Sequence, residues 1–299
     1  MRTLVLWLAI GISILPTLCH AEAFRFSVLM RMPEESIEDN AWRIAIEHAQ
    51  TNESAFIVVN GLKHSSERCN ETLYQQRIDL LAQASVPVIL SMAAADWAYC
   101  RDRQNRPAGL VWLNFLREKI AGDISTQSNS ALTLKHQSAM PAYRSYSENS
   151  RWVYDRILFA TLHVAADNNQ YLEAAGRSSE FEDRQVANRD WIKRLAEVAA
   201  REHRGAIVIF CDGNPLPAPW QRAQGRDGYK DIRKQLRELA EKSGQWVLVV
   251  QGSSVDTAKT PPEIVWADRL GYITLPTGVS MLTADLNATQ PFALTNEVP

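Results

Sequence analysis

Short apolar runs alternate with longer amphipathic stretches along this chain of 299 residues. The apolar, β-branched runs predict strands, and the stretches with apolar residues three and four positions apart predict helices. The predicted strands are Phe24 to Leu29, Ala55 to Val59, Val86 to Leu90, Ile157 to Val164, Ala206 to Phe210, Trp246 to Val250 and Ser280 to Asp285. The predicted helices are Ile37–Gln50, Glu71–Gln83, Leu110–Ile120, Asn188–Glu202 and Tyr229–Lys242. This alternation indicates an α/β fold, and continuously apolar strands indicate sheets that are covered on both faces.

Two polar stretches interrupt the pattern. Gly122 to Asn149 is rich in Ser, Thr, Asn and Gln with little periodicity, and it predicts a long surface excursion. Asp212 to Asp227 contains three prolines and is expected to be irregular. Neither stretch is typical of a linker between independent domains, so we expect one domain over residues 22–299.

The N-terminus has the pattern of a secretory signal peptide. Met1-Arg2-Thr3 precedes an apolar run from Leu4 to Leu15, and the small-residue exit ends at Ala21. Cleavage after Ala21 would leave a periplasmic or secreted product. A membrane anchor would need roughly 20 apolar residues, and this run is shorter. A lipid on Cys19 is a second alternative, although Thr17 and Leu18 precede that cysteine in place of a small residue.

Composition excludes some classes of partner. The formal net charge is −2 and 46% of residues are hydrophobic, which is ordinary for a folded protein. We therefore expect no binding to nucleic acid or to an anionic membrane, and no transmembrane segment after signal cleavage.

Three cysteines remain after signal removal. Cys69 and Cys100 lie in polar loops that follow apolar strands, whereas Cys211 ends an apolar strand. An oxidising compartment then predicts a Cys69–Cys100 disulfide and a buried, inert Cys211. Metal binding by these cysteines is disfavoured because no CxxC pair occurs.

The loops that follow the strands carry the candidate chemistry, because ligands of α/β sheets gather at the carboxyl ends of strands. Their motifs resemble an exported bacterial branch of the calcineurin-like metallophosphoesterases. The matching positions in the second and third loops are Lys63, Cys69, Leu73-Tyr74, Trp97 and Cys100. This resemblance covers nearly the whole mature chain. It implies a four-layer sandwich of two mixed β-sheets flanked by helices.

The departures from that family fall on its metal ligands. The positions where the resemblance implies metal-binding Asp, Asn and His side chains are occupied by Arg31, Gly61, Ala95, Gln251 and Val255. A two-metal hydrolase needs oxygen and imidazole donors to hold cations that activate water. The resemblance therefore implies the fold and argues against the activity, so we expect no catalytic residues and no cofactor.

Two enzymatic alternatives remain open. Ligands relocated to Asp96, His64 or Asp256 would give a functional phosphoesterase that depends on a divalent metal. A metal-independent hydrolase would use Ser253 or Ser254, which follow a strand without forming a GxSxG motif. Asp96 is more simply interpreted as a carboxylate that caps its loop, and His163 as a hydrogen-bonded core histidine.

The favoured hypothesis is a non-catalytic, metallophosphoesterase-like protein that binds a protein or an anionic ligand. If the resemblance holds, Arg31 and Lys63 both point into the former metal cleft and are candidate anion contacts. The simpler interpretation, which we prefer for Arg31, is that it pairs with Asp96 or Asp256 and closes the empty cleft, because paired charges are the common fate of such groups.

Overall fold

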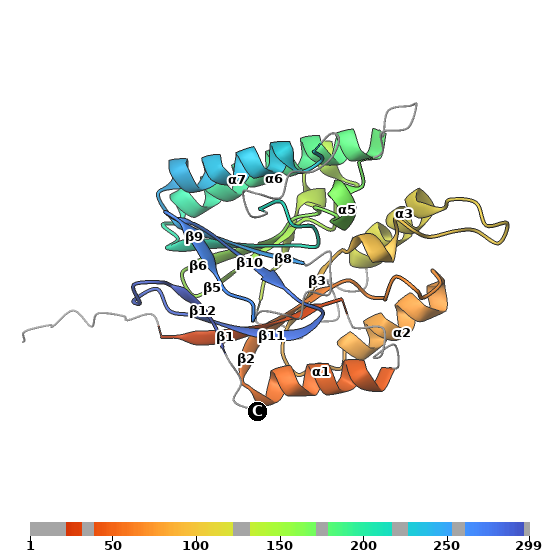
Figure 1. Cartoon of the computed structure of the whole chain (residues 1–299), viewed down its shortest axis with the longest axis horizontal. Coiled ribbons are helices and arrows are strands. Elements are labelled where there is room, and N and C mark those ends of the chain that lie inside the picture. The colour runs from red at the N-terminus through yellow and green to blue at the C-terminus, as the bar shows by residue number, and fades with distance from the viewer. Residues whose placement is uncertain are drawn as a thin grey trace, which may run out of the picture.

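Two β-sheets lie face to face, and helices cover the outer face of each (Figure 1). The computed structural model describes residues 22–31, 39–121, 132–171, 179–216, 227–252 and 261–295. Its layers confirm the expected α/β sandwich of two mixed sheets flanked by helices. Within the described ranges, no helix is both long and apolar enough to span a bilayer.

The first sheet has five strands in the order β12-β11-β1-β2-β3. Strands β1, β2 and β3 are parallel, whereas β11 pairs antiparallel with both β1 and β12. The bounds are β1 Phe24–Met30, β2 Ser54–Asn60, β3 Val88–Ser91, β11 Gly278–Ala284 and β12 Phe292–Leu294. The carboxyl ends of the three parallel strands therefore lie at one edge of this sheet.

The second sheet has seven strands in the order β4-β5-β6-β7-β8-β10-β9. Strands β6, β7, β8 and β10 are parallel, and the outer strands β4, β5 and β9 run antiparallel to their neighbours. The bounds are β4 Lys135–His136, β5 Ser150–Tyr154, β6 Ile157–Thr161, β7 Ala206–Cys211, β8 Trp246–Gly252, β9 Val265–Ala267 and β10 Leu270–Leu275.

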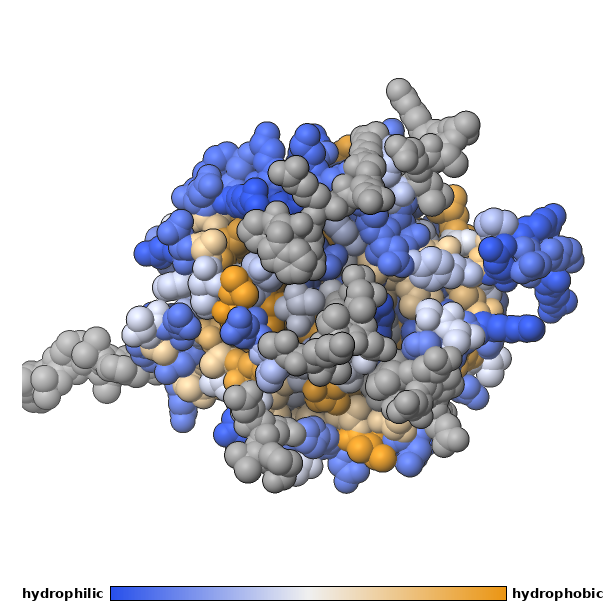
Figure 2. All heavy atoms as spheres, in the orientation of Figure 1, coloured by the Kyte–Doolittle hydropathy of each residue, from blue (hydrophilic) through white to orange (hydrophobic). Residues whose placement is uncertain are grey.

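The helices form two outer layers. Those nearest the five-stranded sheet are α1 (Asp39–Thr51), α2 (Glu71–Leu81) and α3 (Gly109–Lys119). The long helices α6 (Ser179–Arg201) and α7 (Lys230–Ser243) cover the seven-stranded sheet. Their outer faces are hydrophilic, as the blue surface at the top of Figure 2 shows. This amphipathicity holds each helix on its sheet, because the apolar face is buried.

Short helical turns complete the described structure. The α5 turn covers Ala166–Asn169, and single 3₁₀ turns cover Ala94–Asp96, Gln137–Ala139 and Pro141–Tyr143.

Aromatic side chains fill the space between the sheets. The rings of Phe26 and Phe56 stack with centroids 5.4 Å apart, and the ring of Phe159 meets Phe56 edge-on at 4.9 Å. Trp152 and Phe210 extend the same cluster. Each such pair adds about 0.5–1.5 kcal/mol to the free energy of burial, so this layer fixes how the two sheets are aligned.

The structure corrects one expectation about the polar stretch 122–149. Residues 122–131 lie outside the described ranges, but Ser147, Glu148 and Asn149 are fully buried rather than on the surface. Their polar groups form hydrogen bonds or an ion pair with other parts of the chain. Helix α6 also begins earlier than expected, at Ser179 rather than Asn188. Its first turns bury the polar residues Arg184 and Gln185, so the sequence there does not show the apolar spacing of a helix.

Candidate functional site

The carboxyl ends of strands from both sheets converge on one ion pair. Arg31 follows β1, and its amide donates to the carbonyl of Asn60 at the end of β2. Its guanidinium Nε lies 3.3 Å from Oδ1 of Asp212, the residue directly after β7 in the other sheet. The Asp212 side chain is fully buried, and that of Arg31 is 22% exposed. The pair therefore bridges the two sheets at their common edge.

Backbone amides hold Asp212 in this position. Its Oδ2 accepts hydrogen bonds from the amides of Ala94, after β3, and Ala166, after β6, each at 2.8 Å. The two amides and the guanidinium surround the Asp212 carboxylate with donors. Asp212 thus connects the ends of β1, β3, β6 and β7.

Two glycines leave room for the Arg31 side chain. Gly61 follows β2 with a φ of +85°, and a Cβ there would lie 3.5 Å from the Arg31 Cγ and 2.9 Å from the Ala93 Cβ. Gly252 ends β8, and a Cβ there would lie 3.2 Å from the Arg31 Nη2. The arginine therefore lies against both glycines and fills the space between the strand ends.

Asp96 is a second buried carboxylate beside this pair. Its Oδ1 accepts from the amides of Leu62 at 2.8 Å and Lys63 at 3.3 Å, and its Oδ2 accepts from the amide of Ala93 at 3.0 Å. These bonds confirm its interpretation as a loop-capping residue. Burial raises the pKa of Asp96 to about 6, and the negative charge of Asp212 adds to that rise against the opposing amides and Lys63.

Lys63 is engaged by its own loop. Its side chain is buried, and its ammonium donates to the carbonyl oxygens of His64 at 3.0 Å and Glu67 at 2.9 Å. Of the two candidate anion contacts, Lys63 thus points to its own loop, whereas Arg31 pairs with Asp212 rather than with Asp96.

A disulfide joins the loops that carry these groups. Cys69 and Cys100 are bonded, with Cα atoms 5.6 Å apart, and Cys211 is free and buried, as the sequence predicted. The Tyr74 hydroxyl donates to the carbonyl of Asp96 at 2.5 Å, which ties α2 to the same loop. Loss of the disulfide would thus make the loop that positions Asp96 less rigid.

The remaining expected positions are inert or lie outside the described residues. Ala95 is buried within the 3₁₀ turn. The Gln251 amide is paired, since its Nε2 donates to Thr274 Oγ1 at 3.0 Å and its Oε1 accepts from the Leu216 amide at 3.3 Å. Val255, Ser253, Ser254 and Asp256 fall in 253–260, which is outside the described ranges.

A left-handed turn lies next to the site. Asp167, Asn168, Asn169 and Gln170 all have φ between 53° and 57°. Each such residue costs roughly 1–2 kcal/mol, so the surrounding structure must hold the turn in place. Asn168 does so by accepting from the amide of Gly228 at 2.8 Å, and the Tyr99 hydroxyl donates to Asp167.

A network of buried polar side chains contacts the left-handed turn. His163 Nδ1 lies 2.9 Å from Glu148 Oε1, and Arg117 Nη2 lies 2.6 Å from the same oxygen. This confirms His163 as a hydrogen-bonded core residue. Arg184 donates to the side chain and the carbonyl of Asn169 in the turn. Burial works against ionisation of Glu148, but His163 and Arg117 outweigh it and lower its pKa to about 2.

The site's donors do not suit a two-metal centre. A guanidinium, which carries a positive charge and has no lone pair to donate, lies at the meeting point of the strand ends. Among the residues that the structure describes, no cluster of three or more His, Cys, Asp or Glu side chains could hold a metal ion. The arrangement is a fixed internal ion pair with one partly exposed cationic edge.

Sequence reasoning missed Asp212 and Glu148. Asp212 lies two residues after the predicted strand Ala206 to Phe210, so reading that loop marks it as a candidate but does not reveal its partner. Glu148 gave no such signal, because its partners His163 and Arg117 lie 15 and 31 residues away.

Comparisons with known proteins add a distant likeness. No family profile matches the chain, and no curated protein matches it. Among solved structures, it is similar to the crystal structure of a novel phosphatase from Mycoplasma pneumoniae, with 9% sequence identity and a TM-score of 0.44. That match covers 92% of this chain and 95% of the other. The interpretation of the site therefore rests on its own contacts.

Proposed function

We propose that this protein is a non-catalytic, metallophosphoesterase-like protein that binds a protein or an anionic ligand, with the anion contact at Arg31. The observation that carries the proposal is the ion pair of Arg31 with Asp212 at the edge where strands of both sheets end. A cation bound there would have to compete with the guanidinium of Arg31 for the carboxylate of Asp212.

The alternative of relocated metal ligands meets a second obstacle. An ionised carboxylate offers about four lone-pair sites. Three backbone amides already occupy Asp96, and two amides and Arg31 occupy Asp212. About one lone-pair site on each carboxylate is then left, which is fewer than the several protein ligands that a metal centre needs.

The exposed part of Arg31 can recognise an anion. Its side chain is 22% exposed although its Nε faces a fully buried carboxylate. A guanidinium carries five N–H donors in a planar fork. Phosphate or carboxylate groups match that planar set of donors and would not be hydrolysed without an activated water.

Export is part of the same proposal. A periplasmic or secreted location is supported by the N-terminal signal pattern and by the Cys69–Cys100 disulfide, since such bonds persist in oxidising compartments. The mature chain would begin after Ala21.

The loss of hydrolysis is tested with purified, signal-free protein. Elemental analysis is combined with turnover of p-nitrophenyl phosphate across Mn²⁺, Zn²⁺, Fe²⁺ and Mg²⁺. We expect no stoichiometric metal and no metal-dependent turnover. Turnover that a chelator abolishes would show that relocated ligands support the enzyme.

The anion contact is tested by calorimetric titration with inorganic phosphate. Arg31→Gln should abolish binding. Asp212→Asn should strengthen it, because the guanidinium then loses its internal competitor. Lys242→Gln, which removes an exposed charge on α7, serves as the control and should leave binding unchanged. Equal affinity of wild type and Arg31→Gln would rule out this contact.

A further inference from the structure

A groove of about 630 Å³ lies between α6 and the edge of the seven-stranded sheet, and it shares no residue with the Arg31 site. Its apolar lining includes Trp191 and Val198 of α6, with Leu134 and Met140 opposite. Small-molecule sites commonly have this size and combine an apolar body with a few polar groups.

Basic side chains dominate the charged part of the lining. Four are Lys or Arg, whereas Glu197 is the one carboxylate among the lining residues. The basic residues are Lys135, Arg151, Arg194 and Arg201. The groove therefore offers a surplus of positive charge above an apolar floor.

Two of these four basic side chains make no ion pair with another described residue. Arg194 pairs with Asp190 at 2.6 Å, and Arg201 lies 3.4 Å from Glu202. Among the described residues, neither Lys135 nor Arg151 has a side-chain ion pair or hydrogen bond. Burial lowers the pKa of Arg151, opposed by the negative charge of Glu202 and aided by the positive charge of Arg201.

The strand register places these two charges together. Lys135 of β4 is directly opposite Arg151 of β5 in the antiparallel pair. Like charges at opposed positions destabilise a sheet, and the nearby carboxylate of Glu202 is shared with Arg201 and Arg204. A bound anion would supply the missing negative charge.

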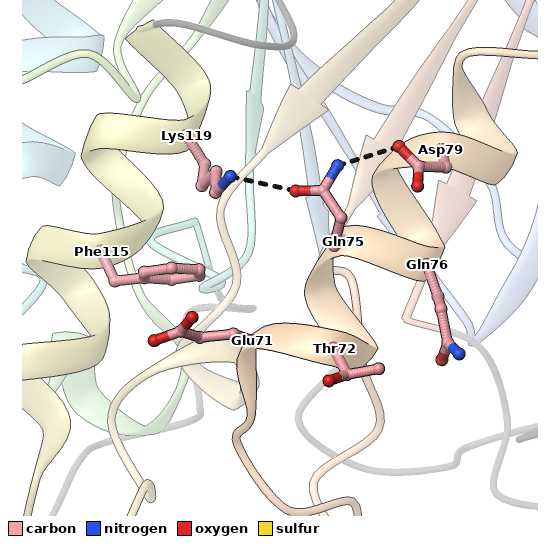
Figure 3. A pocket seen from close by; sticks show the side chains of 7 residues that line it. All are labelled: Glu71, Thr72, Gln75, Gln76, Asp79, Phe115 and Lys119. Carbon is pink, nitrogen blue, oxygen red and sulfur yellow. Dashed lines mark hydrogen bonds between the residues drawn. The ribbon is translucent and has the colours of Figure 1, made fainter.

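The hollow between α2 and α3 provides a contrast. There Lys119 donates to Gln75 at 3.0 Å, and Gln75 donates to Asp79 at 2.9 Å, so the polar groups satisfy one another (Figure 3). The α6 groove lacks such internal matching at Lys135 and Arg151.

We propose that the α6 groove binds a small, freely diffusing amphiphilic acid, whose carboxylate or phosphate group meets Lys135 and Arg151 and whose apolar body lies on Trp191 and Val198. The two residues are direct partners on paired strands, so their side chains leave the sheet side by side. Arg151 suits an oxyanion because its guanidinium can donate two parallel hydrogen bonds.

The test is calorimetric titration of the mature chain with sodium decanoate and, as a neutral match, decanol. We expect decanoate to bind at least roughly tenfold more tightly than decanol, as one charge-assisted hydrogen bond allows. Arg151→Gln and Lys135→Gln should each weaken decanoate binding roughly tenfold on the same basis.

Three controls make the result specific. Lys242→Gln removes an equal charge outside the groove and should leave decanoate binding unchanged. Arg31→Met removes any carboxylate bound at the ion-pair site but should leave the Arg151-dependent binding of decanoate unchanged, which separates this groove from that site. Thermal unfolding of ligand-free Arg151→Gln should stay close to that of wild type, because the lost attraction to Glu202 offsets the relief of repulsion from Arg201 and Lys135. Unchanged decanoate affinity in Arg151→Gln, equal binding of decanol, or no decanoate binding to wild type would overturn the proposal.

Discussion

Arg31→Met tests whether the ion pair with Asp212 holds the two sheets together at the site. Methionine keeps an unbranched apolar stem against Gly61 and Gly252 but removes the guanidinium. Asp212, fully buried, would then be left with two backbone amides as its partners among the described residues. The substitution therefore isolates the electrostatic part of the contact.

The expected cost follows from the geometry. Unit charges 3.3 Å apart interact by about 5 kcal/mol at an effective dielectric of 20. Breaking a fully buried pair typically costs about 3–5 kcal/mol. Arg31 is partly exposed and the amides continue to stabilise Asp212, so we expect a loss of about 1–3 kcal/mol.

A double-mutant cycle in urea measures this loss. Asp212→Asn removes the negative charge and keeps an oxygen for the two amides, and the double variant removes both charges. The double variant should be more stable than the two single losses predict, with a coupling energy of about 1–2 kcal/mol. Additive losses, or an Arg31→Met variant within about 0.5 kcal/mol of wild type, would refute the structural role of the pair.

Three further changes test the supporting structure. Glu148→Gln should destabilise the protein above pH 4.5 and flatten its acid response. The folded-state pKa of Glu148 is about 2 against an ordinary 4.5, so its contribution of about 3 kcal/mol is present above pH 4.5 and lost as the pH falls towards 2. Urea midpoints across pH measure this, and parallel curves for variant and wild type would contradict it. Replacing Cys69 and Cys100 by serine should cost about 3–4 kcal/mol, since the bond closes a loop with a sequence separation of 31. Reductant should lower wild-type stability to the variant's level, and no effect of reductant would count against this. Gly61→Ala should cost about 2–4 kcal/mol through strain at φ +85° and the contact with Ala93. Gly244→Ala, at φ +66° with open space around it, should show the smaller strain alone in thermal unfolding.

The apolar pattern predicted the central strands because each is covered on both faces. Ala206 to Phe210 and Trp246 to Val250 correspond closely to β7 and β8. The short edge strands β4 and β9 were not predicted, since they expose polar residues and have too few positions to show a period.

The site was predictable only where a residue's position in the chain decides its place. Arg31 follows a buried strand, so its location at the sheet edge could be inferred from sequence. Its partner could not, because Asp212 comes from the other sheet and the pairing depends on how the sheets are aligned. Burial of Glu148 likewise depends on His163 and Arg117, which only the folded chain brings together.

Anomalous diffraction from crystals soaked in Mn²⁺ tests the central claim most directly, because it locates any cation relative to Arg31 and Asp212. We predict no anomalous peak between the strand ends, and the Arg31 Nε should still pair with the Asp212 carboxylate. A peak coordinated by Asp212 and Asp96, with the guanidinium displaced, would contradict it.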